Sequence, residues 1–212
     1  EQIQLHLDGV GEVYLQIDTQ EQRNGKKLLK GVLIQSGSEI SFSEVVLVEA
    51  KNDTVMGSIE TPQGKWLLMP DVESQQHYLI KRPSEEIDDE ILHDPDQSHH
   101  VIEGIGIAPD QLFAKPAPDK DADGNIVIDI FMGFSEKALA LIQDREAYAM
   151  MQLATVNNAL ENSKIDNIRV CLVGTGVTNN HMGMSSSQLS LLKTWFAEGI
   201  AKYSPDVVAG FM

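Results

Sequence analysis

The sequence predicts an α+β, multi-domain protein, in which an N-terminal antiparallel β domain over residues 1–82 precedes a β-α-β-α-β unit with a partly parallel sheet over residues 125–212. Three observations lead to this expectation. In the first part, apolar residues recur at every second position, which is the period of half-buried strands. In the second part, helical periodicity alternates with apolar strands. Between the two parts, residues 83–124 are acidic and interrupted by prolines, which is typical of a linker.

The alternation in the first part is clearest over residues 3–7 and 13–17. Further strand-like runs cover residues 28–34, 40–48, 55–60, 65–69 and 77–81. Pro62 and Gly64 predict a tight turn between two of these runs, because proline presets φ and glycine closes the turn. The linker carries five acids within residues 85–90, and we expect one short helix near residues 84–92.

The second part predicts three strands, over residues 126–134, 168–173 and 207–212, separated by two helices. The first helix shows an apolar face made of Ala149, Leu153, Val156 and Leu160. The second shows a face made of Leu189, Leu192, Phe196, Ile200 and Tyr203, with capping-box spacing at Ser185 and Gln188 and a stop at Pro205. This order predicts parallel strands joined by right-handed crossovers.

Composition excludes several classes of partner. The 212 residues carry 16 Lys and Arg against 32 Asp and Glu, so the net charge is −16. A chain this acidic repels a nucleic-acid backbone, and it repels an anionic membrane surface as well. No stretch is apolar for long enough to span a bilayer. The single cysteine, Cys171, allows no intrachain disulfide, and its place in an apolar strand predicts a small core residue.

One acidic loop has the pattern of a calcium site. Asp119, Asp121, Asp123 and Asn125 alternate around Gly124, like the opening of an EF-hand loop in which oxygens converge on one cation. The position that should supply a bidentate glutamate is Ile130, so Asp129 or water would have to replace that ligand. The same residues also suit a solvated loop between domains, and both interpretations stay open.

Other candidate sites favour ordinary structural roles. His93, Asp94, Asp96, His99 and His100 form a cluster of metal-ligating types, but their spacing matches no structural zinc pattern and predicts a solvated linker. The run from Gly174 to Gly176 lacks the third glycine of a dinucleotide fingerprint, because position 179 is Asn179, and it predicts a loop before a helix. A nucleotide-binding α/β protein is therefore the weakest functional class.

No catalytic constellation is visible in the chain. Ser185, Ser186 and Ser187 lack the G-x-S-x-G elbow, and His181 is expected to be a loop residue. The six histidines include no H-E-x-x-H arrangement, which would place two imidazoles beside a general base on one helix face. The sequence therefore predicts no catalytic residue.

The second part resembles the start of a metzincin zinc peptidase of the reprolysin-like (adamalysin-like) bacterial branch. The similarity lies in residues 126–139, 148–177 and 187–212. It includes Asn158-Ala159-Leu160, Ile168-Arg169, Leu172-Val173-Gly174 and Asp206-Val207-Val208, which match successive motifs of that family. In the first part, residues 55–59, 62–66 and 77–79 resemble the β-rich propeptide of such peptidases.

The resemblance implies a fragment of a secreted bacterial metalloendopeptidase precursor, in which zinc activates water to hydrolyse a peptide or protein substrate. It implies a metzincin-like N-terminal subdomain at residues 125–212, with the zinc helix beyond the chain and no zinc ligand within it. We therefore expect that the chain is cut from a longer one and that activating cleavage falls in the linker. The alternative hypothesis is a non-enzymatic adhesion or binding module stabilised by calcium.

Overall fold

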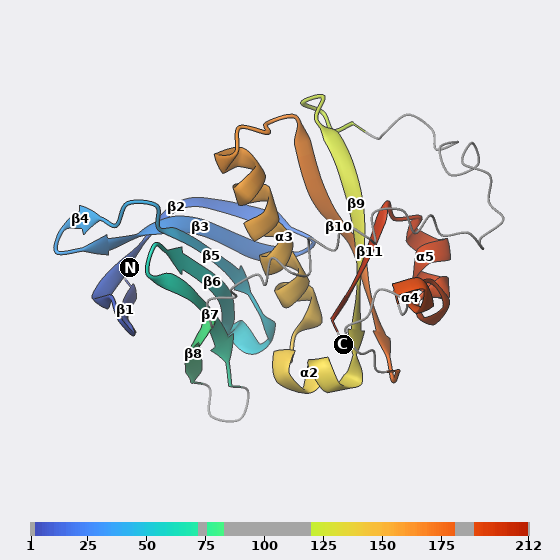
Figure 1. Ribbon diagram of the computed structural model, residues 1–212, viewed down its shortest axis with the longest axis horizontal. Coiled ribbons are helices and arrows are strands. Elements are labelled where there is room, and N and C mark those ends of the chain that lie inside the picture. The colour runs from blue at the N-terminus through green and yellow to red at the C-terminus, as the bar shows by residue number, and fades with distance from the viewer. Residues whose placement is uncertain (1–2, 72–75, 83–119, 181–188, 212) are drawn as a thin grey trace, which may run out of the picture.

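The computed structural model describes residues 3–71, 76–82, 120–180 and 189–211. Its elements lie in four layers, which are a large antiparallel sheet, one long helix, a small parallel sheet and a pair of short helices (Figure 1). The protein is therefore a mixed α/β structure with two sheets of different kinds, as predicted at this level of detail. The expected helix near residues 84–92, the predicted linker up to residue 119 and the capping residues Ser185 and Gln188 lie outside the described residues.

The large sheet contains the eight strands of the first part. They are β1 (Ile3–Leu7), β2 (Gly11–Arg23), β3 (Lys26–Gln35), β4 (Ser38–Glu39), β5 (Glu44–Glu49), β6 (Val55–Thr61), β7 (Gly64–Pro70) and β8 (His77–Arg82), with a 3-10 turn η1 (Lys51–Asp53). Their order is β1-β2-β3-β5-β6-β7-β8, with β4 paired to β3, and all neighbours are antiparallel. The turn between β6 and β7 and the predicted strands are confirmed, except that the strand expected over residues 40–48 begins only at Glu44 and that the short strand β4 was not predicted.

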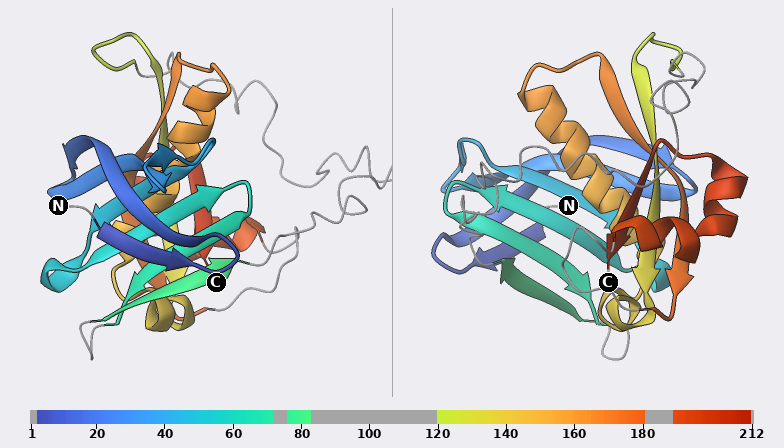
Figure 2. Two further views of the ribbon diagram at one scale, coloured as in Figure 1. Left: turned by 90° about the vertical axis from the view of Figure 1, so that its left-hand side faces the viewer. Right: turned by 45° about the vertical axis from the view of Figure 1, so that its right-hand side comes forward.

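Both faces of this sheet are buried. Val46 and Val48 of β5 pack on the side of the long helix, whereas Val45 and Leu47 pack on the opposite side with residues of β1, β2, β6 and β7. The sheet therefore curls so that its first strands cover its own outer face (Figure 2). Gly31 permits this curl, because a Cβ there would lie 1.9 Å from the carbonyl oxygen of Gln16, beside a bulge in β2.

The small sheet contains β9 (Ile126–Ser135), β10 (Ile168–Thr178) and β11 (Val207–Phe211) in the order β10-β9-β11. Its strands are all parallel, as predicted. The helix α3 (Arg145–Asn162) connects β9 to β10, and α4 (Leu189–Trp195) and α5 (Ala197–Tyr203) lie between β10 and β11. A short helix, α2 (Glu136–Ile142), was not predicted. The hydroxyl of Ser135 caps it by accepting a hydrogen bond from the backbone N–H of Ala138.

Two helix predictions are corrected. Val156 is 44% exposed, so it does not belong to the buried face of α3. The helix lies between the two sheets and buries residues on two sides, including Ala147, Met150, Met151 and Ala154, which removes a simple one-face period. The predicted single helix over residues 189–203 is divided into α4 and α5 at Phe196, whose backbone is not helical.

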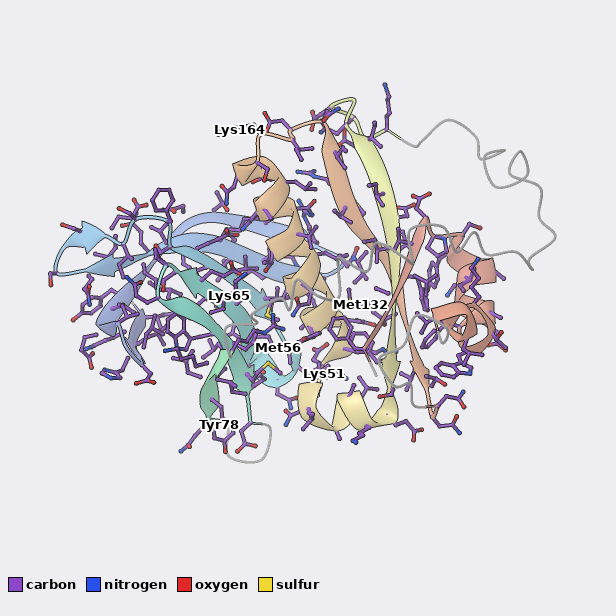
Figure 3. All side chains as sticks on the ribbon, in the orientation of Figure 1. Lys51, Met56, Lys65, Tyr78, Met132 and Lys164 are labelled. Carbon is purple, nitrogen blue, oxygen red and sulfur yellow. The ribbon has the colours of Figure 1, made fainter. Side chains whose placement is uncertain are left out.

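One hydrophobic core joins the two parts of the chain. It contains Val46, Met56 and Met69 from the large sheet together with Met132 of β9 and Met151 of α3. Figure 3 shows Lys51 and Met56 at the end of the large sheet that approaches α2, with Met132 on β9 beyond α3. A second cluster, centred on Phe131, Leu192 and Phe196, fills the space between the small sheet and the short helices. Among the described helices, none is long and apolar enough to cross a membrane.

Candidate functional site

The predicted calcium loop uses its central carboxylate to hold its own backbone. Asp121 accepts hydrogen bonds at Oδ1 from the backbone N–H groups of Asp123 and Asn125, at 3.0 and 2.9 Å. Its Oδ2 accepts from the side-chain amide of Asn125 at 2.9 Å. These hydrogen bonds, the one from the Asn125 side chain first, lower the pKa of Asp121. A calcium ion bound at Oδ2 would have to displace the Asn125 amide. Asp119 lies outside the described residues.

Of the remaining candidate sites from the sequence, some lie outside the described residues and one was assigned to the wrong kind of element. The histidine cluster at residues 93–100, His181 and the serines at 185–187 lie outside the described residues. The prediction of a loop at Gly174 to Gly176 is wrong, because these residues belong to β10. Their glycines make room for aromatic rings: a Cβ would lie 2.6 Å from Tyr203 at Gly174 and 2.8 Å from Phe131 at Gly176.

Cys171 lies in β10, as predicted, but it is half-buried and belongs to none of the core clusters among the described residues, so the prediction of a core residue is wrong. It lines a cavity of about 390 Å³ where the turn between β2 and β3 meets α3 and β10. Burial raises the pKa of its thiol, although Arg23 opposes that shift. A thiol with a raised pKa is a poor nucleophile at neutral pH, so the arrangement does not favour covalent catalysis.

A second cavity, of about 310 Å³, lies at the start of α3. Lys26, Arg145, Thr175 and Tyr203 are among its lining residues, and Arg145 Nε donates to Thr175 Oγ1 at 3.0 Å. Within the part of the chain that the structure describes, no group of three His, Cys, Asp or Glu side chains is arranged to hold a metal ion.

The most developed polar arrangement lies at the junction of the large sheet with α3. Asp144 is 3% exposed and caps α3 by accepting at Oδ1 from the backbone N–H groups of Glu146 and Ala147. Its Oδ2 accepts from Lys26 Nζ and from the backbone N–H of Lys51, both at 3.0 Å. Burial opposes the charge of Asp144, but the hydrogen bonds from Ala147 and Lys26 outweigh it and lower the pKa. One carboxylate thus satisfies the start of α3, a lysine of β3 and a backbone group of η1.

A second polar contact joins the sheet to the other end of α3. The side-chain amide of Asn158 donates to Oε1 of Glu44, and that of Asn162 lies 3.4 Å from Oε2. Burial raises the pKa of Glu44, and the hydrogen bond from Asn158 opposes that shift. The Oδ1 of Asn158 is buried and has no hydrogen-bond partner among the described residues. Lys30 Nζ lies 3.9 Å from Glu161 Oε1 on the same side of the junction.

Sequence reasoning missed this junction. Asp144 directly before a helix is a capping signal that the sequence does contain, and it could have located the start of α3. Nothing in the sequence pairs Asp144 with Lys26, because 118 positions separate them.

Comparisons with known proteins add no further assignment, since no protein family, curated protein or solved structure matches the chain.

Proposed function

We propose that this chain is part of the precursor of a secreted zinc metalloendopeptidase of the metzincin class, with residues 1–82 as the prosegment and residues 125–212 as the N-terminal part of the catalytic domain. The observation that carries the proposal is that the family-like motifs fall on consecutive elements. Asn158-Ala159-Leu160 lies in the last turns of α3, Leu172-Val173-Gly174 lies within β10, and Asp206 directly precedes β11.

The first part supports the same proposal. The propeptide-like residues 55–59 belong to β6, residues 62–66 form the turn into β7, and residues 77–79 begin β8. These three strands are neighbours in one sheet, so the resemblance follows a single structural unit rather than scattered segments. A β-rich prosegment, a linker and a catalytic domain is the order of a zymogen.

The proposal assigns zinc to residues beyond this sequence, since the sequence contains no H-E-x-x-H motif. When bound, zinc would supply an activated water for hydrolysis of a peptide bond. The residues described here would build the first strands and helices of that domain, and none of them is assigned a catalytic step.

The most direct test is the gene downstream of codon 212. We expect an open reading frame that continues into an H-E-x-x-H motif, followed by a longer chain whose peptide hydrolysis is abolished by a chelator and restored by zinc. A stop codon at that point, or a long downstream frame without the motif, would contradict the proposal. Replacing the glutamate of the motif by glutamine should abolish hydrolysis without preventing zinc binding.

Activating cleavage should fall between residues 83 and 124. Limited proteolysis of the precursor, followed by mass spectrometry of the products, checks this expectation. First cuts within residues 1–82 would contradict it. The calcium-binding module remains the alternative function, and calorimetric titration with calcium separates the two, since a module stabilised by calcium must release or absorb heat and shift its melting temperature.

A further inference from the structure

We propose that the large sheet is held by the rest of the protein as a non-covalent partner, so that the molecule stays one complex when the chain is cut between residues 83 and 119. The inference does not depend on the peptidase hypothesis, because it rests only on contacts between the sheet and the elements from β9 onward. A stop codon after residue 212 would leave it intact.

The centre of this junction is apolar and closed to solvent. Val46 and Met56 from the sheet belong to the same cluster as Phe134 of β9 and Met151 of α3, and each is at most 1% exposed. A dry apolar centre of this kind is typical of interfaces between permanent partners, because separating it returns large apolar surfaces to water.

Polar contacts surround that centre. The Asp144 carboxylate binds Lys26 and the backbone of Lys51 near the start of α3, and Glu44 binds Asn158 and Asn162 near its end. At the turn between β2 and β3, the amide of Asn24 lies 3.4 Å from the carbonyl oxygen of Leu172. An apolar centre bordered by hydrogen bonds and ion pairs is the usual anatomy of a specific protein interface.

Once the chain is cut, only these non-covalent contacts can hold the two pieces together. The chain has a single cysteine, so no intrachain disulfide can connect the sheet to the α/β elements. The ion pair is the contact most sensitive to loss of one partner, because Asp144 is almost fully buried and its carboxylate would lose its charged partner without Lys26. It therefore anchors the sheet as well as capping α3.

The test is to place the recognition site of a sequence-specific protease within residues 95–105, cut the folded protein completely and capture it on a resin through a tag on the C-terminal piece. We expect mass spectrometry to find both pieces on the resin after washing in native buffer, and the C-terminal piece alone after washing in concentrated urea. Loss of the N-terminal piece in native buffer would overturn the proposal.

The ion pair is tested on the same cut protein, immobilised through its C-terminal piece. Lys26→Met should speed release of the N-terminal piece at least about tenfold, since losing one partner of a buried charge pair acts mainly on dissociation. Lys27→Met is the matched control, because alternation along β3 places Lys27 on the face opposite to that of Lys26. The release rate of the Lys27→Met protein should equal that of the unsubstituted protein. Equal release rates for both variants would refute the anchoring role of Lys26. Asp144→Asn, which keeps a capping oxygen, should speed release as Lys26→Met does.

Discussion

The side chain of Asn157 pairs with the backbone of Val170 as a neighbouring strand would. Its Nδ2 donates to the Val170 carbonyl oxygen at 2.9 Å, and its Oδ1 accepts from the Val170 N–H at 2.8 Å. Among the described strands, Val170 lies on β10 at one edge of the small sheet, so this pair satisfies two backbone groups that none of these strands reaches on that side. It also fixes α3 against the sheet on which it packs.

We therefore expect Asn157→Leu to lower the free energy of unfolding by about 1–3 kcal/mol, because it leaves a buried N–H and a buried carbonyl unsatisfied. Urea denaturation followed by circular dichroism measures this change. The neighbouring variant Val156→Ala should change stability by less than about 0.5 kcal/mol, since Val156 is exposed. A loss for Asn157→Leu no larger than that of the control would contradict the pairing.

Gly133 predicts a steric effect at the second core cluster. A Cβ at this position would lie 2.2 Å from a ring carbon of Phe196, which is itself buried. Gly133→Ala should therefore destabilise the protein by about 1–3 kcal/mol through overpacking. Phe196→Leu shortens the side chain that the new methyl group meets. The double variant should therefore lose less stability than the two single variants lose in sum. Strictly additive losses would show that the ring does not press on this position.

We expect Glu44 to make the stability of the folded protein depend on pH. Burial raises its pKa in the folded state, so folding favours the protonated carboxyl. The resulting stabilisation is fully present below the unfolded pKa, at about pH 4, and is lost as the pH rises through the folded pKa. Lys30 on β3, Glu60 on β6 and Glu161 on α3 also act on this carboxyl, the two glutamates raising its pKa and Lys30 lowering it.

Glu44→Gln should accordingly raise the melting temperature at neutral pH, since it removes a buried charge and keeps an acceptor for Asn158. The gain should shrink as the pH falls below about 4, where Glu44 is protonated in both states. Thermal melts of both proteins between pH 3 and 7 provide the measurement. Glu39→Gln is the control, because Glu39 is exposed. An equal rise in melting temperature for this variant would mean that the effect comes from net charge and not from burial of Glu44.

Cys171 should react slowly with thiol reagents in the native protein. Burial raises the pKa of its thiol, which lowers the thiolate fraction at any given pH, and the side chain is half-buried. At pH 7, modification by an aromatic disulfide should be at least about tenfold slower than in urea, given the usual dependence on thiolate and access. Equal rates in both states would place the thiol in open solvent.

The sequence predicted those features that depend on local pattern. The alternation of apolar and polar residues located the strands of the large sheet, and apolar runs located the three parallel strands. Where a helix packs between two sheets, the apolar pattern does not identify its buried residues correctly. The buried residues of α3 include Ala147, Ala154 and Asn158 on more than one side, so the face through Val156 was only partly buried.

Features that depend on distant residues could not be predicted. Gly174 and Gly176 suggested a loop, whereas they lie within β10 because the rings of Tyr203 and Phe131 need the space. The junction between Lys26 and Asp144 joins residues whose separation in the chain conceals their contact. A single sequence contains no signal for such a pair, since neither side chain differs in type from ordinary surface charges.

The position of α3 between the two sheets has a consequence for synthesis on the ribosome. The large sheet is complete at residue 82, but the helix that covers Val46 and Met56 begins only at Arg145. At a translation rate of about 5–20 residues per second, this apolar face of the sheet stays exposed for several seconds before α3 is synthesised. Chaperone binding to nascent chains arrested in this interval should therefore be stronger than to chains arrested after α3 has emerged.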